Sequence, residues 1–412
     1  MRLLFLTNFY PPASRGGYEQ WCQEIADGLR ERGHDVLVLT SQHGRDHFQG
    51  IDPSWVRREL HLEMEFASMR NAFQFFTNRK KREKESLTKL QQIIDSYTPD
   101  ATLIWGMWNF PRSLPALAEK LMPGRVAYYI GDYWLTLPSQ FVNYWNAPAR
   151  NVVTGLPKLM LKPFARKILA GEERPVLNVE HALFPSAFMR GELERRGVSF
   201  QNTKIIYGAI DTSKYLDPQA LSKKNEKISM LYIGRITYEK GVHTAIEAVK
   251  NLVNGDGFNH LKLTIVGDGD IDYVNELHDL VGQKNIASYV TFLPAQPKEA
   301  LPALYRQSDI FLFTSIWAEP FGRVIVEAMA SGLAVVGTSV GGAAEILFED
   351  VNALVYTPDD SASLSRQLKR VIESSSLREK LSRAGRETAV KKFDIQRMTT
   401  EIETYLKEIV HS

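Results

Sequence analysis

The chain has 412 residues and a mass of 46.8 kDa, with 44% hydrophobic and 24% charged residues. This length favours two or three domains that each bury a core, and the composition excludes wholesale disorder. A single cysteine excludes a disulfide framework and any multi-cysteine metal site. With 50 basic and 48 acidic side chains, the formal charge of +2 argues against a general nucleic-acid binder.

Charge is divided unevenly along the chain. Residues 1–210 hold 27 basic and 21 acidic side chains, whereas the remainder holds 23 basic and 27 acidic. The first part is therefore +6 and the second −4. We expect the two parts to bind differently charged partners or to meet different environments.

The first half alternates short β-rich runs with longer amphipathic segments. A loop rich in Pro and Gly at residues 11–17 leads into a predicted helix in which Trp21, Ile25 and Leu29 recur at every fourth position. This helix should end near Gly33 and bury Cys22 as a small hydrophobe. The predicted strands are Arg2–Thr7, Asp35–Thr40, Ala101–Trp105 and Val126–Ile130. Such alternation predicts a parallel sheet with helices on both faces.

The pattern restarts after Asp211. The polar segment Lys223–Lys227 is expected to be a linker, and a second α/β unit is predicted over roughly residues 212–390. Its predicted strands are Ser229–Ile233, Lys262–Val266, Val290–Leu293, Ile310–Thr314 and Ala334–Gly337. The tail Ile395–Val410 should form an amphipathic helix. Two such units should leave a crevice between the carboxyl ends of their sheets, where ligands bind to loops that follow strands.

Two cations follow the predicted strand Ser229–Ile233. The loop Gly234-Arg-Ile-Thr-Tyr-Glu-Lys-Gly241 carries Arg235 and Lys240 and leads into a helix. Arginine offers a planar fork to phosphate oxygens and lysine adds a point charge, so this loop suits a phosphate. The alternative is a solvated turn with two surface cations.

A more specific pattern follows the strand Ile310–Thr314. Pro320 and Gly322 interrupt the chain, so a helix is predicted from about Gly322 to Gly332. Its amino end offers backbone N–H groups and a positive dipole to an anion.

Two glutamates bracket this helix start. Carboxylates accept hydrogen bonds from hydroxyl groups, so Glu319 suits a sugar and Glu327 suits a ribose. The alternative makes Glu319 a capping residue and Glu327 a surface glutamate.

These motifs resemble those of the retaining glycosyltransferases of the large family-four group, the glycosyl transferases group 1. Glu319-Pro-Phe-Gly…Glu327 is a Glu-x7-Glu motif, and Gly234-Arg-x3-Glu-Lys-Gly241 precedes it. Further matching segments are Tyr10-Pro-Pro…Gly16-Gly17, Val266-Gly-Asp-Gly269, Phe292-Leu-Pro294, Gly341-Gly342-Ala-Ala-Glu345 and the terminal helix. The resemblance covers nearly the whole chain.

The resemblance implies the α/β fold class GT-B, with two Rossmann-like doubly wound domains facing across a cleft. The C-terminal helix would cross back to the N-terminal domain. We therefore predict an N-terminal acceptor domain at residues 1–210, completed by the crossover helix at 395–412. Residues 211–394 would form the domain that binds the nucleotide-sugar donor.

The resemblance also implies roles at matching positions. Arg235 and Lys240 would bind the donor diphosphate, Glu319 the donor sugar hydroxyls and Glu327 the ribose. The other residues expected to bind the donor, largely through their backbones, are Gly16, Gly17, Gly234, Gly267, Leu293, Pro320, Phe321, Gly322, Arg323 and Val324. Uridine is the base that the resemblance favours, while guanosine and adenosine stay open.

A nucleotide sugar leaves behind a strongly negative diphosphate, so catalysis needs preorganised positive charge. Arg235, Lys240, the Gly17 N–H and the helix end at Gly322 would supply it. We see no Asp-x-Asp metal motif near these groups and expect neither a metal nor another cofactor. The resemblance likewise implies metal-independent transfer with retention, for which a front-face route fits best.

One position departs from the family pattern. Many relatives carry His-Asp after the strand that here ends at Ile130, with the His close to the donor sugar, whereas this chain has Gly131-Asp132. Asp132 is therefore the main catalytic candidate of the N-terminal domain, and the alternative is a turn or cap residue. His181, which should follow another strand, is expected to be structural and buried rather than catalytic.

The acceptor side is predicted from Tyr133–Gly171, a stretch without Asp or Glu. Its cations, aromatic and aliphatic side chains suit an anionic membrane surface or an acceptor carried on a lipid pyrophosphate. The residues expected to act there are Tyr133, Trp134, Lys158, Lys162, Arg166 and Lys167. The alternative is a basic face beside ordinary core residues. The basic run Arg79–Lys84 is expected to be a solvated helix face.

The expected function is transfer of a hexose-type sugar from a nucleotide sugar to a glycan or lipid-linked acceptor in polysaccharide or glycolipid biosynthesis. The N-terminal apolar run is too short for a signal sequence and no run is long enough to span a membrane, so we expect a cytoplasmic protein, peripheral on the inner face of the membrane. Two alternatives stay open: a GT-B nucleotide-sugar epimerase and a non-catalytic nucleotide-sugar-binding subunit of a polysaccharide assembly complex. A dinucleotide oxidoreductase is disfavoured because no Gly-x-Gly-x-x-Gly follows the first strand.

Overall fold

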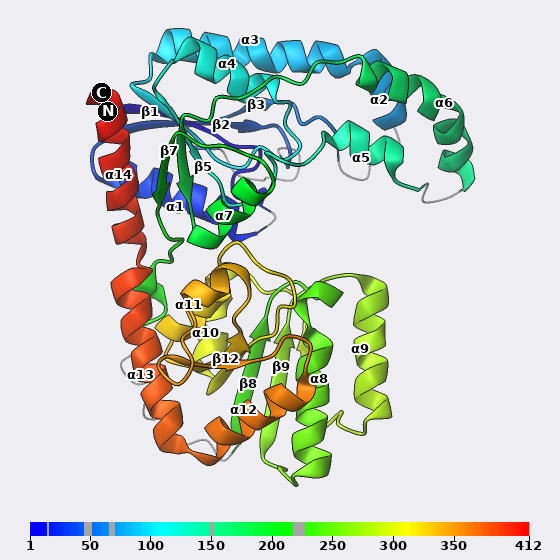
Figure 1. The fold of residues 1–412 in the computed structure, drawn as a ribbon, viewed down its shortest axis with the longest axis vertical. Coiled ribbons are helices and arrows are strands. Elements are labelled where there is room, and N and C mark those ends of the chain that lie inside the picture. Colours follow the sequence, from blue (N-terminus) through cyan, green and yellow to red (C-terminus); the bar gives the residue numbers. More distant parts are fainter. Residues whose placement is uncertain (15, 45–51, 66–70, 149–151, 217–226, 412) are drawn as a thin grey trace. The chain divides into compact units, whose positions relative to one another are not determined.

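The computed structural model describes residues 1–14, 16–44, 52–65, 71–148, 152–216 and 227–411 and divides the chain into two compact units (Figure 1). The first unit comprises Met1–Pro185, Met189–Ile206 and the chain from Thr399 onward. The second comprises Ser186–Phe188 and Tyr207–Met398. Of the predicted linker Lys223–Lys227, only Lys227 falls within the described residues.

Seven parallel strands form the sheet of the first unit, in the order β3-β2-β1-β4-β5-β6-β7. The strands are β1 (Arg2–Leu6), β2 (Asp35–Ser41), β3 (Val56–Leu60), β4 (Ala101–Ile104), β5 (Val126–Tyr129), β6 (His181–Phe184) and β7 (Asn202–Ile205). Leu3–Leu6 pairs with Val36–Leu39 on one side and with Ala101–Ile104 on the other, so the apolar β1 occupies the middle of the sheet. The four strands predicted in this half are confirmed.

The helices of the first unit are α1 (Gly17–Glu31), α2 (Asn71–Thr77), α3 (Arg79–Tyr97), α4 (Ser113–Leu121), α5 (Gln140–Asn146), α6 (Val152–Ala170) and α7 (Ala187–Arg195), whose first two residues are grouped with the second unit. As predicted, Trp21, Ile25 and Leu29 of α1 are buried, and so is Cys22. The chain leaves α1 through Gly33, whose φ of 85° suits glycine.

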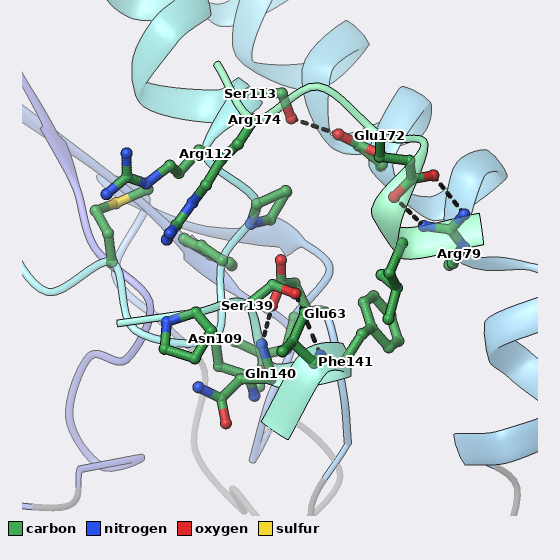
Figure 2. Close-up of a pocket in the computed structure, with 18 of the residues that line it drawn as sticks. Glu63, Arg79, Asn109, Arg112, Ser113, Ser139, Gln140, Phe141, Glu172 and Arg174 are labelled. Carbon is green, nitrogen blue, oxygen red and sulfur yellow. Dashed lines mark hydrogen bonds and ion pairs between the residues drawn. The ribbon is translucent and has the colours of Figure 1, made fainter. Parts of the chain in front are cut away.

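Helices α2, α5 and α6 lie together beyond the sheet (Figure 1) and enclose a small apolar cluster of their own. Phe75, Phe141, Trp145 and Ala165 form its buried part. A cavity of about 250 Å³ lies where this cluster meets the loops that follow β3, β4 and β5 (Figure 2).

Six parallel strands form the second sheet, in the order β10-β9-β8-β11-β12-β13. The strands are β8 (Ile228–Ile233), β9 (Leu261–Val266), β10 (Val290–Leu293), β11 (Ile310–Phe313), β12 (Ala334–Thr338) and β13 (Ala353–Tyr356). The helices are α8 (Val242–Lys250), α9 (Ile271–Gln283), α10 (Leu301–Arg306), α11 (Arg323–Ala330), α12 (Ser361–Glu373) and α13 (Ser375–Lys392), followed by α14 (Ile395–His411). All five strands predicted here are confirmed.

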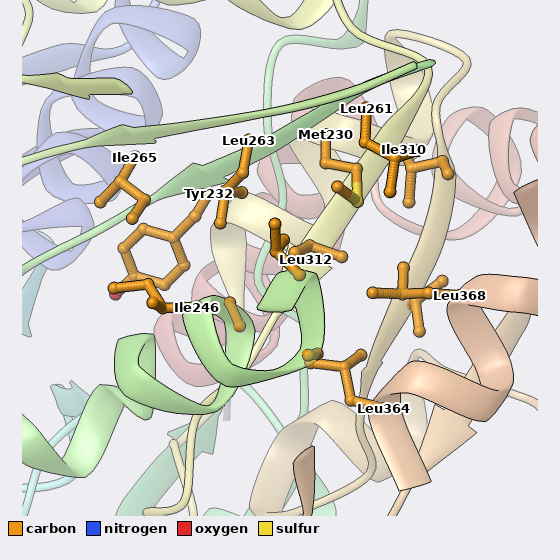
Figure 3. Packing of buried hydrophobic residues seen from close by; sticks show 14 of the residues in the cluster. Met230, Tyr232, Ile246, Leu261, Leu263, Ile265, Ile310, Leu312, Leu364 and Leu368 are labelled. Atoms are coloured by element: carbon orange, nitrogen blue, oxygen red, sulfur yellow. The ribbon is translucent and has the colours of Figure 1, made fainter. Parts of the chain in front are cut away.

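The core of the second unit lies between its sheet and helices α8 and α12 (Figure 3). Met230, Leu263 and Leu312 project from three neighbouring strands, and Ile246 and Leu368 meet them from the two helices. Each of these side chains is fully buried, which is why the strands read as nearly continuous apolar runs.

Four short strands, β3, β6, β7 and β13, escaped prediction. β3 and β7 are edge strands with charged or polar residues, and an edge needs fewer apolar side chains than the middle of a sheet. The prediction that His181 follows a strand is wrong, because His181 is the first residue of β6.

The strand order reverses once in each sheet. After the central strand β1 the chain adds strands on one side as far as β3 and then crosses to β4 on the other, and β8, β10 and β11 repeat this order. The loops after β1 and β4, and those after β8 and β11, therefore diverge at the carboxyl edge of each sheet. In doubly wound sheets this divergence is where ligands bind.

The terminal helix α14 confirms the predicted amphipathic tail and packs on the first unit from Thr399 onward. A Cβ added to Gly28 of α1 would lie 3.1 Å from the Thr399 hydroxyl oxygen, so glycine permits this close contact. The Glu403 carboxylate accepts hydrogen bonds from Arg32 at 2.9 Å and from Lys407 at 2.5 Å, and it lies 3.1 Å from the His34 ring nitrogen.

Replacing Glu403 by Gln should lower the free energy of unfolding at pH 7 by about 1 kcal/mol, because three partners lose a charged acceptor. The Lys407 hydrogen bond, followed by those of Arg32 and His34, lowers the pKa of Glu403 from 4.5 to about 2. Since the folded-state pKa is depressed, the stabilisation is present above pH 4.5 and is lost as the pH falls toward 2. Urea unfolding at pH 7, 5 and 4 tests this. The exposed Glu408→Gln on the same helix is the control, and equal losses in both variants would contradict the assignment.

Candidate functional site

The candidate site of the second unit lies at the carboxyl edge of its sheet. Strands β8 and β11 are neighbours, so the loops that follow them begin side by side. The Thr314 hydroxyl donates a hydrogen bond to the Lys240 carbonyl at 2.6 Å. The N–H groups of Ile316 and Trp317 donate to the Glu239 carbonyl at 2.9 and 3.2 Å. These contacts fix the two loops to each other.

Lys240 and Glu319 are brought together by this arrangement. The Lys240 Nζ lies 2.7 Å from Glu319 Oε1, and the two side chains are only 13% and 17% exposed. The ammonium also lies 5.6 Å from the ring centre of Trp317. For Lys240 the solvated-turn alternative is therefore wrong, and the residue at the N-cap of α11 is Gly322 rather than Glu319.

Arg235, by contrast, has an exposed side chain at the beginning of the same loop. Its carbonyl accepts a hydrogen bond from the Tyr232 hydroxyl at 2.8 Å, which holds the backbone while leaving the guanidinium to project. A backbone hydrogen bond, then Thr237 and the positive charges of Arg235 and Lys240, lower the pKa of Glu239. The charges of Arg235 and Lys240 therefore outweigh that of Glu239 in this loop.

Two motif glycines permit close backbone approach. Gly267 follows β9 with a φ of 153°, and a Cβ there would lie 1.9 Å from the Gly234 carbonyl oxygen. Gly241 has a φ of 63°, and its Cβ would lie 2.2 Å from the Thr314 carbonyl oxygen. Neither position accepts a side chain without moving the loops.

The loop before α11 is held from two further directions. The Gly342 N–H donates to the Glu319 carbonyl at 2.7 Å, and the Ser186 hydroxyl donates to the Pro320 carbonyl at 2.5 Å. Glu345 accepts the N–H groups of Ala187 and Phe188 at 3.0 and 2.8 Å. Ser186–Phe188 were not predicted from the sequence. Their only indication there is a serine directly before a helix, a common capping residue.

Helix α11 begins at Arg323 after Gly322, whose φ is 119°, and so confirms the predicted helix start. The first turn of a helix carries N–H groups without intrahelical acceptors. Val324 of this turn is half-buried. The Phe321 side chain is buried against Phe393 with ring centres 5.6 Å apart, so Phe321 can offer a ligand only its backbone.

Glu327 is buried within α11 and only 4% exposed, so the surface-glutamate alternative is wrong. Its carboxylate accepts a hydrogen bond from the Tyr305 hydroxyl at 2.9 Å and one from Arg323 Nε at 3.1 Å. A carboxylate has room for further hydrogen bonds after accepting two. Leu293 lies at the end of β10, where its carbonyl accepts the Gly267 N–H at 3.1 Å.

An Asp-x-Asp spacing does occur near these groups, so the expectation that the sequence has none there is wrong. Asp268-Gly-Asp270-Ile-Asp272 follows β9. Asp268 accepts the Ala295 N–H at 3.1 Å, and Asp270 caps α9 by accepting the N–H groups of Asp272 and Tyr273 at 3.0 and 3.2 Å. Within the described ranges, no group of three or more His, Cys, Asp or Glu side chains is arranged to hold a metal ion.

In the first unit, Asp132 follows β5 as predicted. Its carboxylate accepts the Trp134 N–H at 3.1 Å, which is the contact of a turn residue. Burial, with a smaller contribution from Glu19, raises the pKa of Asp132 to about 7. The carboxyl can therefore gain or lose a proton near neutral pH, as acid–base groups of active sites do.

Tyr18 fills the space beside Gly131. Its hydroxyl donates to the Tyr129 carbonyl and accepts the Gly131 N–H at 3.2 Å. A Cβ at residue 131 would lie 2.7 Å from a ring carbon of Tyr18, so the phenol occupies the place where a histidine side chain would begin. Tyr18 was not predicted from the sequence, where its only indication is its position directly after Gly16-Gly17.

Gly16, Gly17 and His181 are the remaining residues of the first unit for which the sequence predicted a position or role. The Gly16 N–H donates to Glu19 Oε2 at 3.0 Å, and α1 begins at Gly17. No described atom lies within 4 Å of a Cβ built at Gly16, so the chain itself does not require glycine there. The His181 ring lies 3.2 Å from the Tyr405 hydroxyl and packs edge-on against that ring, which fits the structural interpretation.

The residues predicted for the acceptor side are divided between interior and surface. Lys158 is buried, donates to the Ala147 carbonyl at 2.9 Å and lies 4.4 Å from the Tyr144 ring centre, so its predicted role at a membrane is wrong. Trp134 is buried and lines the cavity of Figure 2, and Tyr133 lies half-buried beneath Arg196.

Lys162 is half-buried, while Arg166 and Lys167 are exposed. The most exposed face of α6 is apolar rather than basic. Its members, each 65–69% exposed, are Leu156, Leu159, Met160 and Phe164. The basic run Arg79–Lys84 is only partly a solvated face, because Arg79 pairs with Glu172 at 2.8 Å and Arg82 with Glu65 at 2.7 Å. In the part of the chain that the structure describes, no helix combines the length and apolar composition that crossing a membrane requires.

Two Rossmann-like units with matching strand reversals define the GT-B fold, and solved structures share it. Sucrose-phosphate synthase from Thermosynechococcus elongatus aligns over 100% of this chain and 99% of its own, with a TM-score of 0.72 and 16% identity. Anabaena HepE, crystallised in complex with UDP, aligns over 99% of this chain and 100% of its own, with a TM-score of 0.68 and 21% identity.

Residues 15–214 match the profile of Glycosyltransferase Family 4 and residues 214–388 match that of Glycosyl transferases group 1, so the chain belongs to the group 1 glycosyltransferases of family-four type. An uncharacterized glycosyltransferase of Methanocaldococcus jannaschii is 31% identical over 184 residues, which is 44% of this chain and 45% of that one. The chain spans about half the length of the curated relatives it matches.

Gly131→Ala should lower the free energy of unfolding by about 1–3 kcal/mol, because the added Cβ overlaps the Tyr18 ring. In a Tyr18→Ala background that cost should largely disappear, giving a coupling of about 1 kcal/mol or more. Urea unfolding of the four proteins measures the cycle. Gly191→Ala, within α7, where a Cβ meets nothing within 4 Å, is the control and should not destabilise, because alanine favours the helix by up to about 1 kcal/mol. An unchanged cost of Gly131→Ala without Tyr18 would contradict the assignment.

Proposed function

We propose that this protein transfers a hexose-type sugar from a nucleoside-diphosphate sugar, with uridine as the base, to a hydroxyl group of a glycan or lipid-linked acceptor. The observation that carries the proposal is the pairing of Lys240 with Glu319 beside the amino end of α11. A cation and a helix start suit the diphosphate of a nucleotide sugar, and a carboxylate beside them suits the hydroxyl groups of its sugar.

The donor would lie along the carboxyl edge of the second sheet. Its diphosphate would bind Lys240, Arg235 and the first N–H groups of α11. Glu319 uses one carboxylate oxygen for Lys240, and its other oxygen is suited to a sugar hydroxyl. Glu327 would contact the ribose and the chain near Leu293 the base. HepE, a structural neighbour, has been crystallised with UDP and with UDP-glucose, which supports this choice of donor.

Transfer would proceed at the front face of the donor sugar. The bond between the anomeric carbon and the diphosphate oxygen breaks, and its electron pair leaves with the nucleoside diphosphate. The acceptor oxygen forms the new bond from the same side and its proton passes to the departing phosphate, so configuration is retained. Lys240, Arg235 and the helix dipole stabilise the charge that develops on the leaving group. No step of this route calls for a metal ion.

Asp132 is the proposed polar group of the first unit. With a pKa near 7, its carboxyl is suited to accept a hydrogen bond from an acceptor hydroxyl or from the donor sugar. Tyr18 takes the volume of the missing histidine, and its hydroxyl is engaged by backbone groups. We therefore assign Tyr18 a positioning role and keep Asp132 as the catalytic candidate.

The two alternatives are disfavoured by the intact motifs. Arg235, Lys240, Glu319 and Glu327 are all present, which counts against a non-catalytic binding subunit. An epimerase converts one nucleotide sugar into another and needs no acceptor. Acceptor-dependent release separates transfer from both.

Lys240→Met should reduce the rate of nucleoside diphosphate release by about 100-fold or more, because the leaving group loses its closest fixed charge. UDP should also bind more weakly, as measured by calorimetry. Lys262→Met, at an exposed position of β9, is the matched control and should keep both properties. Full activity of Lys240→Met would refute the proposed site.

Retention is tested separately by NMR of the transfer product. The anomeric configuration of the transferred sugar should equal that of the donor. An inverted product would exclude the front-face route while leaving the donor site intact.

The exposed apolar face of α6 supports peripheral contact with an anionic membrane, which would bring a lipid-linked acceptor to the first unit. Leu156, Leu159, Met160 and Phe164 recur at helical spacing, while Ala165 faces the apolar cluster beneath. Lys167 and Arg166 flank this face. An apolar face bordered by cations is typical of helices that lie in the membrane interface.

Replacing Leu159 and Phe164 by Ser should reduce binding to vesicles of phosphatidylcholine and phosphatidylglycerol by about tenfold or more, because two apolar side chains no longer leave water. Co-sedimentation measures the bound fraction. Val176→Ser removes an apolar side chain that is 91% exposed but lies outside α6, and should have no effect. Unchanged binding of the α6 variant would reject the membrane proposal.

A further inference from the structure

The cavity of the first unit has no role in the donor chemistry described above. It has a volume of about 250 Å³ and is lined by the segments that follow β3, β4 and β5, by α3 and by the chain after α6 (Figure 2). All its lining residues belong to the first unit, so its shape depends on that unit alone.

Most cations around this cavity are neutralised locally. Arg79 pairs with Glu172 at 2.8 Å, Lys80 with the same carboxylate at 3.0 Å, and Arg82 with Glu65 at 2.7 Å. These pairs close the wall formed by α3. They leave little net charge on that side for a ligand.

Arg112 and Arg174 differ from these cations. In Figure 2 their side chains lie next to each other at the cavity. Arg112 donates a hydrogen bond to the Leu135 carbonyl, and Arg174 donates one to the Leu137 carbonyl. Among the described residues, no carboxylate lies within 4.0 Å of either guanidinium, and Arg112 Nε is buried with no hydrogen-bond partner.

Burial makes the charged form of both guanidinium groups less favourable. Burial, and then the charge of Arg174, lowers the pKa of Arg112 to about 10. Burial likewise lowers the pKa of Arg174, against a smaller opposing effect of Glu63. Two neighbouring, partly desolvated cations without an anion form a site that an oxyanion would stabilise.

Glu63 does not fill that need. Its carboxylate accepts the Gln140 N–H at 2.7 Å. Burial raises the pKa of Glu63 to about 7, so near neutral pH the carboxyl is protonated about half of the time. A carboxyl in that state offsets only part of the charge of Arg174.

The rest of the lining suits the body of a sugar. Trp134, Trp108 and Phe141 supply apolar ring surface, and Asn109 and Gln140 supply amide groups. The Arg112 guanidinium lies 6.0 Å from the Trp134 ring centre. Ligand pockets commonly combine such apolar walls with a few polar groups that fix orientation.

We propose that this cavity binds an oxyanion-bearing sugar, with the phosphate or carboxylate group held by Arg112 and Arg174. That the bound molecule is the acceptor rests on the function proposed above, whereas oxyanion binding itself does not. A sugar phosphate and a uronic acid share the required chemistry. The acceptor class would thus be an acidic sugar or one that carries a phosphate.

The test measures anion binding by calorimetry with glucose 1-phosphate and, separately, with glucuronate. The Lys240→Met background weakens the donor phosphate site, and the Arg174 variants then show which part of the remaining binding belongs to the first unit. At least one of the two compounds should bind. Arg174→Gln should weaken that binding by about tenfold or more, since one charge-assisted contact is lost. Arg174→Lys should recover part of it. Arg125→Gln, which removes an exposed cation outside the cavity, should change nothing.

A gain-of-binding variant guards against misfolding as an explanation. Glu63→Gln removes a negative charge beside Arg174 and should strengthen anion binding several-fold at pH 8, where the wild-type carboxyl is largely ionised. Equal binding by wild type, Arg174→Gln and Glu63→Gln, or no binding of either compound, would overturn the proposal. In the transfer assay with an intact donor site, Arg174→Gln should raise the KM for an acidic acceptor more than it lowers kcat. Loss of transfer alone would instead count against the proposed function.

Discussion

A parallel sheet places the carboxyl ends of all its strands at one edge, and in both units the chain reverses its direction of strand addition at the central strand. This constraint makes β8 and β11 neighbours although two strands, β9 and β10, and helices α8, α9 and α10 separate them in the chain. Lys240 and Glu319 can therefore meet at 2.7 Å. The Thr314 hydroxyl and the Glu239 carbonyl lock the same two loops together. Everything proposed for the donor depends on that adjacency.

The candidate residues for the proposed chemistry could be predicted from the sequence, but most of their partners could not. Arg235, Lys240, Glu319 and Gly322 stand out because residue type and spacing alone suit an anion and a sugar.

The burial of Glu327 could not be inferred from the sequence, because it depends on a contact with Tyr305 of another helix. The same holds for Lys158, whose ammonium finds the Ala147 carbonyl only once α5 and α6 pack. Local pattern predicts which groups are available, and tertiary packing decides which of them face a ligand.

The inner strands were predictable because burial on both faces makes them continuously apolar, a pattern that the polar edge strands lack.

Position 131 shows how a departure from a family pattern can be compensated in space. The loss of a side chain at Gly131 would leave a void next to Asp132, and voids in protein interiors are costly. Tyr18, which is 113 residues away along the chain, fills that volume and binds the Gly131 N–H. Glycine at 131 and tyrosine at 18 therefore form one structural unit. A single sequence offers no means of pairing them, because nothing in the residues around Tyr18 points to position 131.

The +6 charge of the first half acquires a different meaning once its cations are placed. Arg79 and Arg82 are paired with carboxylates within the fold, so a partner would sense little of their charge. Lys158 donates to a neutral carbonyl and keeps its charge inside the fold. Arg112 and Arg174 border a cavity instead of covering the surface. The outermost face of α6, within the stretch that contains no acidic residue, is apolar. Arg112 and Arg174 therefore place positive charge where a ligand would be enclosed, while contact with a membrane would depend first on apolar side chains. The formal charge of the sequence can exclude a class of partner only after the charges that are paired within the fold have been subtracted from it.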